Sequence, residues 1–426
     1  MNNLKDITLN EFQYLIKGLN DEPHDRGFVI NKHIFEKLEL FVLKSKENSG
    51  CEFLRLTSLN GRKALQALNY VGIIKLKNGP TIEILPKINN DHISNEKVRR
   101  IFLKMLKSLK NAPFKEFGDA SLKTHKMKLN EIFIKIFLDD LDVLVKNGLK
   151  SDYISIEDNL NVLKGKIKFN EHISKNYIHK ERFYVNYDEF IRNRPENRII
   201  KSTIKYLLKN SSLNSNLKRI NEFLFIMDAI PESKNLEKDF AACVNNRLMT
   251  DYKKIIPWCK VFLKNESFTN FKGDEIAYAL LYPMEKIFES YLTEEFKKSG
   301  KFETIVSQGN GYFLAKHKNE GIFRLKPDIY AETSSKKYIM DAKWKILNSD
   351  KNKNYGISQN DMYQLLSYAV VYGCNELRLL YPKSKDFKRI LEFEYNNSIN
   401  YKEKISLKII PIDLERNIAD QIGFLL

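Results

Sequence analysis

Two short apolar segments near the end of the chain, separated by a polar stretch, constrain its fold more than any other feature. Residues 324–330 (Arg-Leu-Lys-Pro-Asp-Ile-Tyr) and 338–344 (Tyr-Ile-Met-Asp-Ala-Lys-Trp) each fit one strand. A hairpin of these strands brings Asp328 alongside Asp341 and Lys343. Because Asp341 and Lys343 are two residues apart, their side chains leave the same face of an extended strand. The segments therefore predict two acids and one ammonium in a small space.

This combination is what a metal-dependent phosphodiesterase needs. Carboxylates at strand ends suit Mg²⁺, which prefers oxygen ligands and keeps several waters. A neighbouring lysine can orient or deprotonate an attacking water. An alternative is that Asp328 belongs to an ordinary Pro-Asp turn and that residues 341–343 are the solvated end of an edge strand. The apolar pair Ile339 and Met340 before the second acid favours a buried strand, and hence the site.

Two predicted helices flank the strands. Residues 361–372 predict a helix that carries Gln364 and Tyr368 on one face. Residues 277–296 predict another, with Glu285 and Glu289 four positions apart. Either helix alone reads as ordinary core packing with solvated polar residues. Together they give the order helix, strand with acid, strand with acid and lysine, helix.

That order resembles the PD-(D/E)xK nuclease fold, and the Gln-x-x-x-Tyr helix resembles its RecB-like version. The resemblance implies metal-binding acids, a lysine that assists water, an acid on the first helix that also binds metal, and a supporting Gln/Tyr pair. Carried onto this chain, these are Asp328 and Asp341, Lys343, Glu289 (with Glu285 as second choice), and Gln364 with Tyr368. The second acid is Asp rather than Glu, a variation that the pattern allows.

The length leaves room for more than this module. At roughly 150 residues per domain, 426 residues predict two to three domains. We expect an α/β protein with a β-rich N-terminal domain at 1–95, a mainly helical middle region at 96–272 and a PD-(D/E)xK nuclease domain of α/β/α type at 273–426. In the first, strands are expected at 52–57, 67–76 and 81–88; in the second, helices at 97–109, 129–145, 189–209, 215–230 and 238–263, with a β piece at 152–168.

A second resemblance covers most of the chain. Residues 65–382 resemble the McrC subunit family of McrBC-type restriction systems, through segments 71–74, 78–79, 82–88, 163–167, 187–190, 195–201 and 283–289 and the nuclease motif. The resemblance implies a subunit that cleaves double-stranded DNA together with a hexameric, McrB-like AAA+ GTPase, usually in response to modified cytosine. It also implies that the N-terminal domain contacts and stimulates the GTPase, although residues 1–65 match nothing that assigns the contact.

The sequence agrees with such a division of labour. It contains no Gly-x-x-x-x-Gly-Lys-[Ser/Thr] loop, so we expect GTP to be bound by the partner, and Mg²⁺ to be the only cofactor of this chain. A net charge of +17 favours a polyanionic partner, although a general bias toward Lys, Asn and Ile would also produce it. The four cysteines lack the spacing of a metal site. No membrane segment or signal peptide is evident, so a cytoplasmic protein is expected.

Two other functions fit the same residues. The chain can be a self-sufficient PD-(D/E)xK nuclease of repair or recombination, whose N-terminal region binds DNA itself. It can also be a non-catalytic adaptor that keeps the nuclease fold and works by activating a GTPase.

Overall fold

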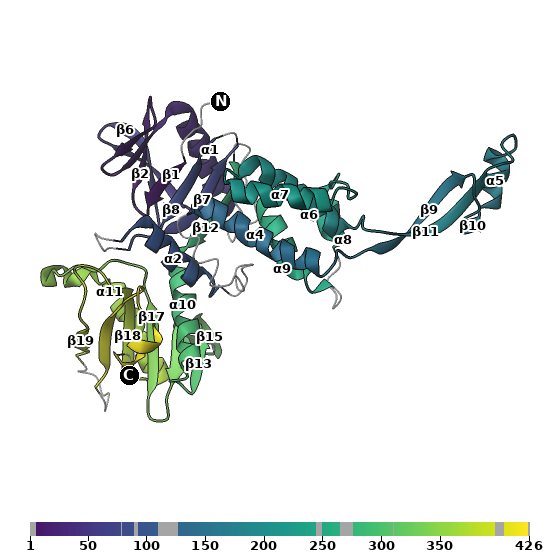
Figure 1. Cartoon of the computed structure of the whole chain (residues 1–426). Helices are drawn as coiled ribbons and strands as arrows, with labels where there is room; N and C mark the ends of the chain where they lie inside the picture. The colour runs from purple at the N-terminus through teal and green to yellow at the C-terminus, as the bar shows by residue number, and fades with distance from the viewer. Residues whose placement is uncertain are drawn as a thin grey trace. The chain divides into compact units, whose positions relative to one another are not determined.

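The computed structural model describes residues 6–77, 79–88, 93–109, 127–243, 249–264, 276–309, 311–396 and 404–424. The chain forms two compact units (Figure 1). Unit 1 combines Met1–Leu129 with Ser267–Leu426, and unit 2 is Asn130–Glu266. Among the described residues, no helix has the length and apolar character needed to cross a membrane.

The N-terminal part of unit 1 consists of two sheets and helix α1 (Lys32–Ser49). One sheet has the order β3-β4-β2-β6-β5, with bounds Glu22–His24, Gly27–Asn31, Tyr14–Gly18, Arg62–Ala67 and Leu54–Leu59. The other has the order β1-β8-β7-β12, with bounds Ile7–Asn10, Thr81–Leu85, Tyr70–Leu76 and Ile276–Pro283. Helix α1 begins after Asn31, whose side chain accepts a hydrogen bond from the Ile34 N–H, and contributes Phe35, Leu38 and Phe41 to the buried core.

Strand β12 corrects one prediction and links two parts of unit 1. The helix predicted over residues 277–296 begins only at Met284, because Ile276–Pro283 pairs antiparallel with β7. Nearly every residue of β12 is buried, and an apolar run of this length does not distinguish a buried strand from a helix. Pro283 ends the strand, and α10 (Met284–Ser299) follows directly. The N-terminal sheet is therefore continuous with the first helix of the C-terminal part.

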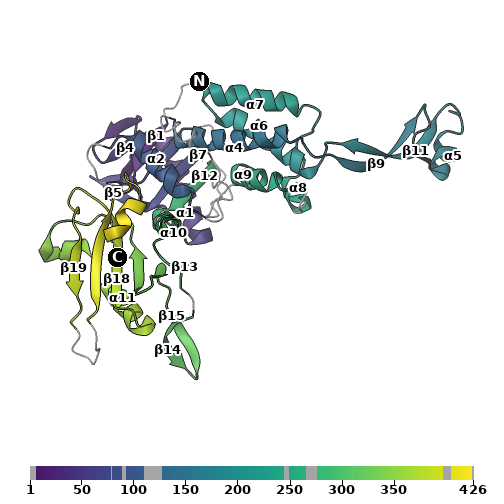
Figure 2. The same ribbon diagram turned by 60° about the horizontal axis from the view of Figure 1, so that its bottom comes forward.

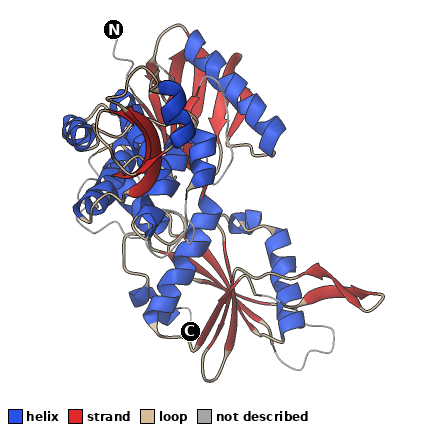
Figure 3. Cartoon of the chain, turned by 90° about the vertical axis from the view of Figure 1, so that its right-hand side faces the viewer, coloured by secondary structure: helices blue, strands red, loops and turns tan. Residues whose placement is uncertain are grey.

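The C-terminal part of unit 1 is a six-stranded mixed sheet with α10 and α11 (Gln359–Tyr372) on opposite sides (Figure 3). Its order is β13-β16-β17-β18-β20-β19, with bounds Thr304–Ser307, Ile329–Glu332, Lys337–Ala342, Glu376–Pro382, Ser406–Ile412 and Leu391–Glu394. Strands β17, β18 and β20 run parallel, and the other neighbours are antiparallel. This part also contains a hairpin of β14 and β15 (Phe313–His317, Glu320–Arg324) and the 3₁₀ helices η2 and η3 (Lys351–Gly356, Ala419–Phe424). Unit 1 also contains helix α2 (Asn95–Leu106), which follows β8 in the sequence.

Unit 2 combines helices with a long hairpin. Its helices are α4 (Leu129–Lys146), α6 (Pro195–Asn210), α7 (Asn214–Ile226), α8 (Leu236–Ala242) and α9 (Tyr252–Lys264). Strands β9 (Asp152–Leu160) and β11 (Phe183–Ile191) pair along nine residues and carry β10 (Lys166–Ile167) and α5 (Phe169–Lys175) between them. Figures 1 and 2 show this hairpin extending away from the helices of its own unit, with α5 at its far end.

The predicted fold class, α/β with a C-terminal α/β/α part, is confirmed, but two middle segments were predicted wrongly. Residues 189–191 belong to β11 rather than to a helix, since they pair with β9, and α6 starts at Pro195, whose fixed φ suits the first turn. The helix expected over 238–263 with an interruption at Pro257 is two helices, α8 and α9, and Pro257 lies inside the second rather than at the interruption. The domain boundaries near 95 and 272 stay predictions. The four cysteines form no disulfide.

Candidate active site

The start of β16 and the end of β17 meet at one edge of the six-stranded sheet. The strands are antiparallel, with Ile329 opposite Met340. Asp328 precedes the first strand, Asp341 lies in the second and Lys343 follows it, so the three predicted side chains gather where β16 begins and β17 ends. The N–H of Lys343 donates to the carbonyl of Leu380 at 2.9 Å, which extends the β17–β18 ladder past Ala342.

Asp341 and Lys343 form an ion pair at this edge. Lys343 Nζ lies 2.7 Å from Asp341 Oδ2, and the Asp341 side chain is almost completely buried. The Lys343 ammonium is the partner of this oxygen. Burial lowers the pKa of Lys343, but the charges of Asp341, Asp328 and Asp361 outweigh this effect and raise the pKa above its ordinary value. Lys343 is therefore an ammonium at neutral pH, suited to orienting a water or a phosphate oxygen.

Asp328 lies close to two other carboxylates. Its Oδ2 accepts a hydrogen bond from the N–H of Ala342 at 2.9 Å, which ties it to the end of β17. Burial, together with the negative charges of Asp341 and Glu289, raises its pKa to about 8. Crowded carboxylates of this kind are stabilised in their charged form by a bound cation.

Glu289 reaches the same place from α10. Gln308 Nε2 donates to its Oε1 at 3.4 Å. Burial raises the pKa of Glu289, the hydrogen bond from Gln308 lowers it, and the charge of Asp341 raises it again, with a net upward shift. Glu285, the second choice for the first-helix acid, is exposed one turn earlier. The charge of Asp341 thus acts on Glu289, and the assignment of Glu289 as the first-helix acid of the site stays a prediction.

Gln364 and Tyr368 of α11 hold the segment that leads into Asp328. Gln364 Nε2 donates to Tyr368 Oη at 2.7 Å, and Tyr368 Oη donates to the carbonyl of Lys326 at 3.1 Å. Burial and the charges of Asp341 and Asp328 raise the pKa of Tyr368. The pair therefore fixes the backbone two residues before Asp328, in keeping with a supporting role.

Sequence reasoning missed two residues of the site. The N–H of Gln308 donates to the carbonyl of Asp328 at 3.0 Å, and its side chain contacts Glu289. Asp361 accepts a hydrogen bond from Tyr381 Oη at 3.4 Å, and its charge contributes to the raised pKa of Lys343. No spacing rule marks Gln308. Asp361 was assigned only to the start of the predicted helix.

The oxygen ligands fit a hard divalent ion. Within the described residues, no three or more His, Cys, Asp and Glu side chains stand ready to enclose a metal. Mg²⁺ does not need such a cage, because it usually binds through one or two carboxylates and completes its shell with waters and substrate phosphates. Asp328, whose pKa is raised by the charges of Asp341 and Glu289, and the neighbouring Asp341 supply carboxylates of this kind.

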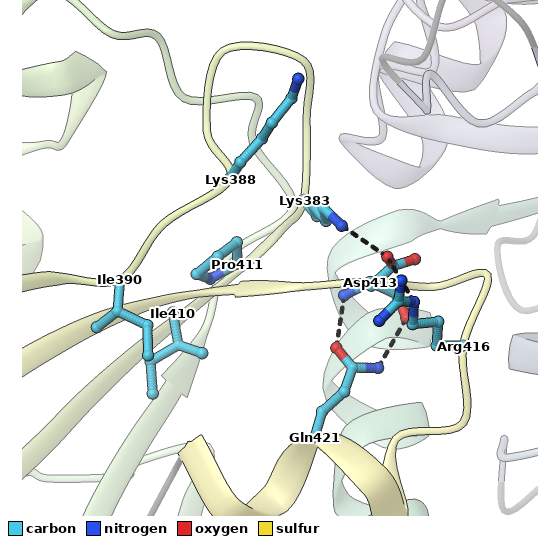
Figure 4. Close-up of a pocket in the computed structure, with 8 residues that line it drawn as sticks. All are labelled: Lys383, Lys388, Ile390, Ile410, Pro411, Asp413, Arg416 and Gln421. Carbon is cyan, nitrogen blue, oxygen red and sulfur yellow. Dashed lines mark hydrogen bonds and ion pairs between the residues drawn. The ribbon is translucent and has the colours of Figure 1, made fainter.

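A basic pocket lies at the same edge of the sheet, two strands away. Figure 4 shows its lining residues, which are Lys383, Lys388, Ile390, Ile410, Pro411, Asp413, Arg416 and Gln421. Lys383 Nζ pairs with Asp413 Oδ2 at 2.8 Å, and Arg416 Nε lies 3.7 Å from the same oxygen. Three cations against one acid leave this pocket positive. Because β17, β18 and β20 are parallel, the residues that follow them, Lys343, Lys383 and Asp413, share one edge.

Comparisons with known proteins place the chain in a family. The model of the family "McrBC 5-methylcytosine restriction system component" matches residues 65–382. The chain belongs to this family. A relative in the McrBC family is the "Type IV methyl-directed restriction enzyme EcoKMcrBC" of Escherichia coli (strain K12), 24% identical over 238 residues, which cover 53% of this chain and 67% of the relative.

Two solved McrBC structures share the fold. One is a chain of the refined half-complex of Thermococcus gammatolerans McrB AAA+ hexamers with bound McrC, with a TM-score of 0.73 and 18% identity, covering 99% of this chain and 100% of that chain. The other comes from the cryo-EM structure of the Thermococcus gammatolerans McrBC complex, with a TM-score of 0.53 and 20% identity, covering 74% of this chain and 89% of that chain. At these identities, the likeness concerns the fold.

Proposed function

We propose that this chain is the DNA-cleaving subunit of a McrBC-type restriction complex and hydrolyses phosphodiester bonds of double-stranded DNA with Mg²⁺. The observation that carries the proposal is the meeting of Asp328, Asp341 and Lys343 at one sheet edge, with a carboxylate oxygen of Asp341 buried beside the Lys343 ammonium. Membership of the McrBC family supports the restriction context. A cytoplasmic location is part of the same proposal.

The side chains of the site have separate tasks. Asp328 and Asp341, with Glu289 nearby, would hold Mg²⁺. When bound, the ion would neutralise charge on the scissile phosphate and favour ionisation of water. Lys343, held as an ammonium by Asp341, orients the attacking water or a phosphate oxygen. Tyr368 fixes the Lys326 carbonyl and thereby the approach to Asp328. The basic pocket of Lys383, Lys388 and Arg416 supplies positive charge for the DNA backbone along the same edge.

The hairpin of unit 2 is the best-supported docking surface for a GTPase partner. Large apolar side chains are exposed along β9, β11 and α5 and in the loops between them: Tyr153, Val162, Leu163, Phe169, Ile173, Tyr177, Ile178 and Phe190. Apolar clusters of this kind mark protein interfaces. We propose that a McrB-like AAA+ GTPase hexamer binds this surface. The solved structure that matches 99% of this chain in fold is described as McrB AAA+ hexamers with bound McrC. The contact expected of residues 1–95 stays a prediction.

Cleavage and partner activation are tested separately. We expect the purified chain to cut modified duplex DNA with Mg²⁺ only when the cognate GTPase and GTP are present, and Asp341→Asn to abolish cleavage while still stimulating the GTPase. Efficient cleavage by the chain alone would favour a self-sufficient nuclease. If the wild type never cuts but stimulates the GTPase, the chain is an adaptor.

The docking surface has its own test. The variant Phe169→Ser/Ile173→Ser should lose GTPase stimulation and complex formation by size-exclusion chromatography without loss of stability, because both side chains are exposed. Phe225→Ser on α7, where the side chain is 84% exposed, is the matched control and should leave both unchanged. Normal stimulation by the double variant would rule out docking through α5.

A further inference from the structure

A buried carboxylate of the N-terminal part reaches the residue next to Lys343. Glu11 follows β1, and its N–H donates to the carbonyl of Leu85 at 3.0 Å. Its side chain is 1% exposed. Glu11 Oε2 accepts hydrogen bonds from the indole Nε1–H of Trp344 at 2.9 Å and from the N–H of Lys87 at 2.8 Å. Residues 333 positions apart in the sequence are thus joined by one buried hydrogen bond.

The environment of Glu11 is unfavourable for a residue that serves only packing. Within the described residues, its second oxygen, Oε1, is buried without a hydrogen-bond partner. Burial raises the pKa of the carboxyl to about 7, although the hydrogen bonds from Lys87 and Trp344 and the charge of Lys87 act to lower it. A buried polar group without full pairing costs free energy that an apolar side chain would avoid. What Glu11 provides in return is a fixed position for the Trp344 ring.

Trp344 connects this bond to both sides of the candidate active site. It follows Lys343 directly, and its ring packs edge-on against Phe288 with centroids 5.4 Å apart. Phe288 in turn precedes Glu289 on α10. Trp344 is the central residue of a tight turn in which the N–H of Lys345 donates to the carbonyl of Lys343 at 3.1 Å, so fixing the Trp344 ring also restrains the backbone that carries Lys343. The indole is therefore held between Glu11 and Phe288, and these contacts involve the residue after Lys343 and the residue before Glu289.

We propose that Glu11 is a positioning residue for DNA cleavage, which acts through Trp344 to hold Lys343 against Asp341. The inference rests on the proposed nuclease function and adds to it a residue outside the nuclease-like part of the chain. Glu11 touches no reacting atom. Its removal lets Trp344 rotate, and Lys343 then samples positions away from Asp341 Oδ2. Displacement of a catalytic group by about 1 Å can reduce a rate by roughly 100-fold.

The first test detects the hydrogen bond without measuring activity. The chain has two tryptophans, so ¹⁵N-labelled protein gives two indole N–H signals, and Trp344→Phe identifies the one from Trp344. Glu11→Ala should shift that signal and speed its exchange with solvent. Glu11→Gln, which keeps an acceptor oxygen, should leave it nearer to the wild type. Glu22→Ala, which removes an exposed glutamate of the N-terminal part, is the control and should change nothing. A Trp344 signal unaffected by Glu11→Ala would overturn the proposal.

The second test is a double-mutant cycle on cleavage by the assembled complex. Glu11→Ala and Trp344→Phe should each lower kcat roughly 10- to 100-fold, with little change in KM for DNA or in GTPase stimulation. Trp344→Phe keeps a ring against Phe288 and loses only the N–H, so it tests the bond even where Glu11→Ala folds poorly. The double variant should be no slower than either single variant, since both remove one interaction. If the kcat losses of the two single variants multiply in the double variant, or if Trp344→Phe leaves kcat unchanged, positioning by Glu11 is refuted. A wild type without nuclease activity would instead refute the proposed function.

Discussion

The ammonium nitrogen of Lys343 lies 2.7 Å from Oδ2 of Asp341, and the Asp341 side chain is only 3% exposed. Such a pair has two consequences, one for catalysis and one for stability. The lysine is kept charged where a phosphate oxygen or a water would approach. The buried aspartate has an opposite charge beside it, whereas a buried carboxylate without such a partner would be strongly unfavourable.

Replacing Lys343 should therefore separate these two effects. We expect Lys343→Met to lower kcat for cleavage by roughly 10²- to 10⁴-fold. It should also destabilise unit 1 by about 3 kcal/mol, since it leaves a buried unpaired carboxylate. Asp341→Asn/Lys343→Met should recover stability in urea unfolding and stay inactive. Cleavage by Lys343→Met within tenfold of the wild-type rate would exclude Lys343 from the reaction.

The raised pKa of Asp328 predicts a specific pH dependence. Its folded pKa of about 8 lies above the ordinary value near 4, so between these pH values the folded state holds a proton that the unfolded state has released. This contribution to stability is complete below about pH 4 and is lost as the pH rises through about 8. Without divalent metal, wild type should lose stability relative to Asp328→Asn between pH 5 and pH 9. Equal differences in urea unfolding at the two pH values would contradict the assignment.

The strand acids could be predicted from the sequence because their placement depends on local rules. A two-residue period and a polar turn suffice to align Asp328 with Asp341 and Lys343, and the 3.6-residue period of α11 suffices to put Gln364 beside Tyr368. Each of these relationships spans less than about 20 residues along the chain.

The parts that escaped prediction depend on contacts between distant segments. Strand β12 was taken for helix because only its pairing with β7, far earlier in the chain, makes it extended. Gln308 is brought to Glu289 by the path of the backbone beside Asp328, which no composition rule encodes. The bond between Glu11 and Trp344 likewise joins two segments that have no shared pattern.

The β7–β12 pairing depends on one glycine. Gly72 has φ 137°, and a Cβ there would lie 1.8 Å from the carbonyl oxygen of Leu280. Gly72→Ala should destabilise unit 1 by about 3 kcal/mol or more, because the strands must separate to admit the methyl group. Gly61→Ala is the matched control. It also has positive φ, at 75°, but open space around the new Cβ, so it should cost about 1 kcal/mol. Similar losses for both variants in thermal unfolding would show that steric contact with Leu280 is unimportant.

The basic pocket predicts how the complex responds to salt. Asp413 and Lys343 follow strands two positions apart in the sheet, a lateral separation of about 10 Å. One DNA strand rises about 3.4 Å per nucleotide, so a strand held at the active edge places a phosphate near the pocket within roughly three nucleotides.

Lys388 is exposed in this pocket. We expect Lys388→Ala to weaken DNA binding and to reduce the slope of log K against log salt by about 1, the value for one lost phosphate contact. The kcat should stay unchanged because Lys388 lies away from the carboxylates. Lys337→Ala is the control: that lysine is also exposed, but it begins β17 and therefore lies at the opposite end of the sheet. Both slopes can be measured by fluorescence anisotropy of a labelled duplex at salt concentrations from about 50 to about 200 mM, a range over which the loss of phosphate contacts strongly changes affinity. Equal slopes for Lys388→Ala and Lys337→Ala would show that the DNA binds elsewhere. A DNA backbone that passes this edge of the sheet contacts Lys388 and does not contact Lys337.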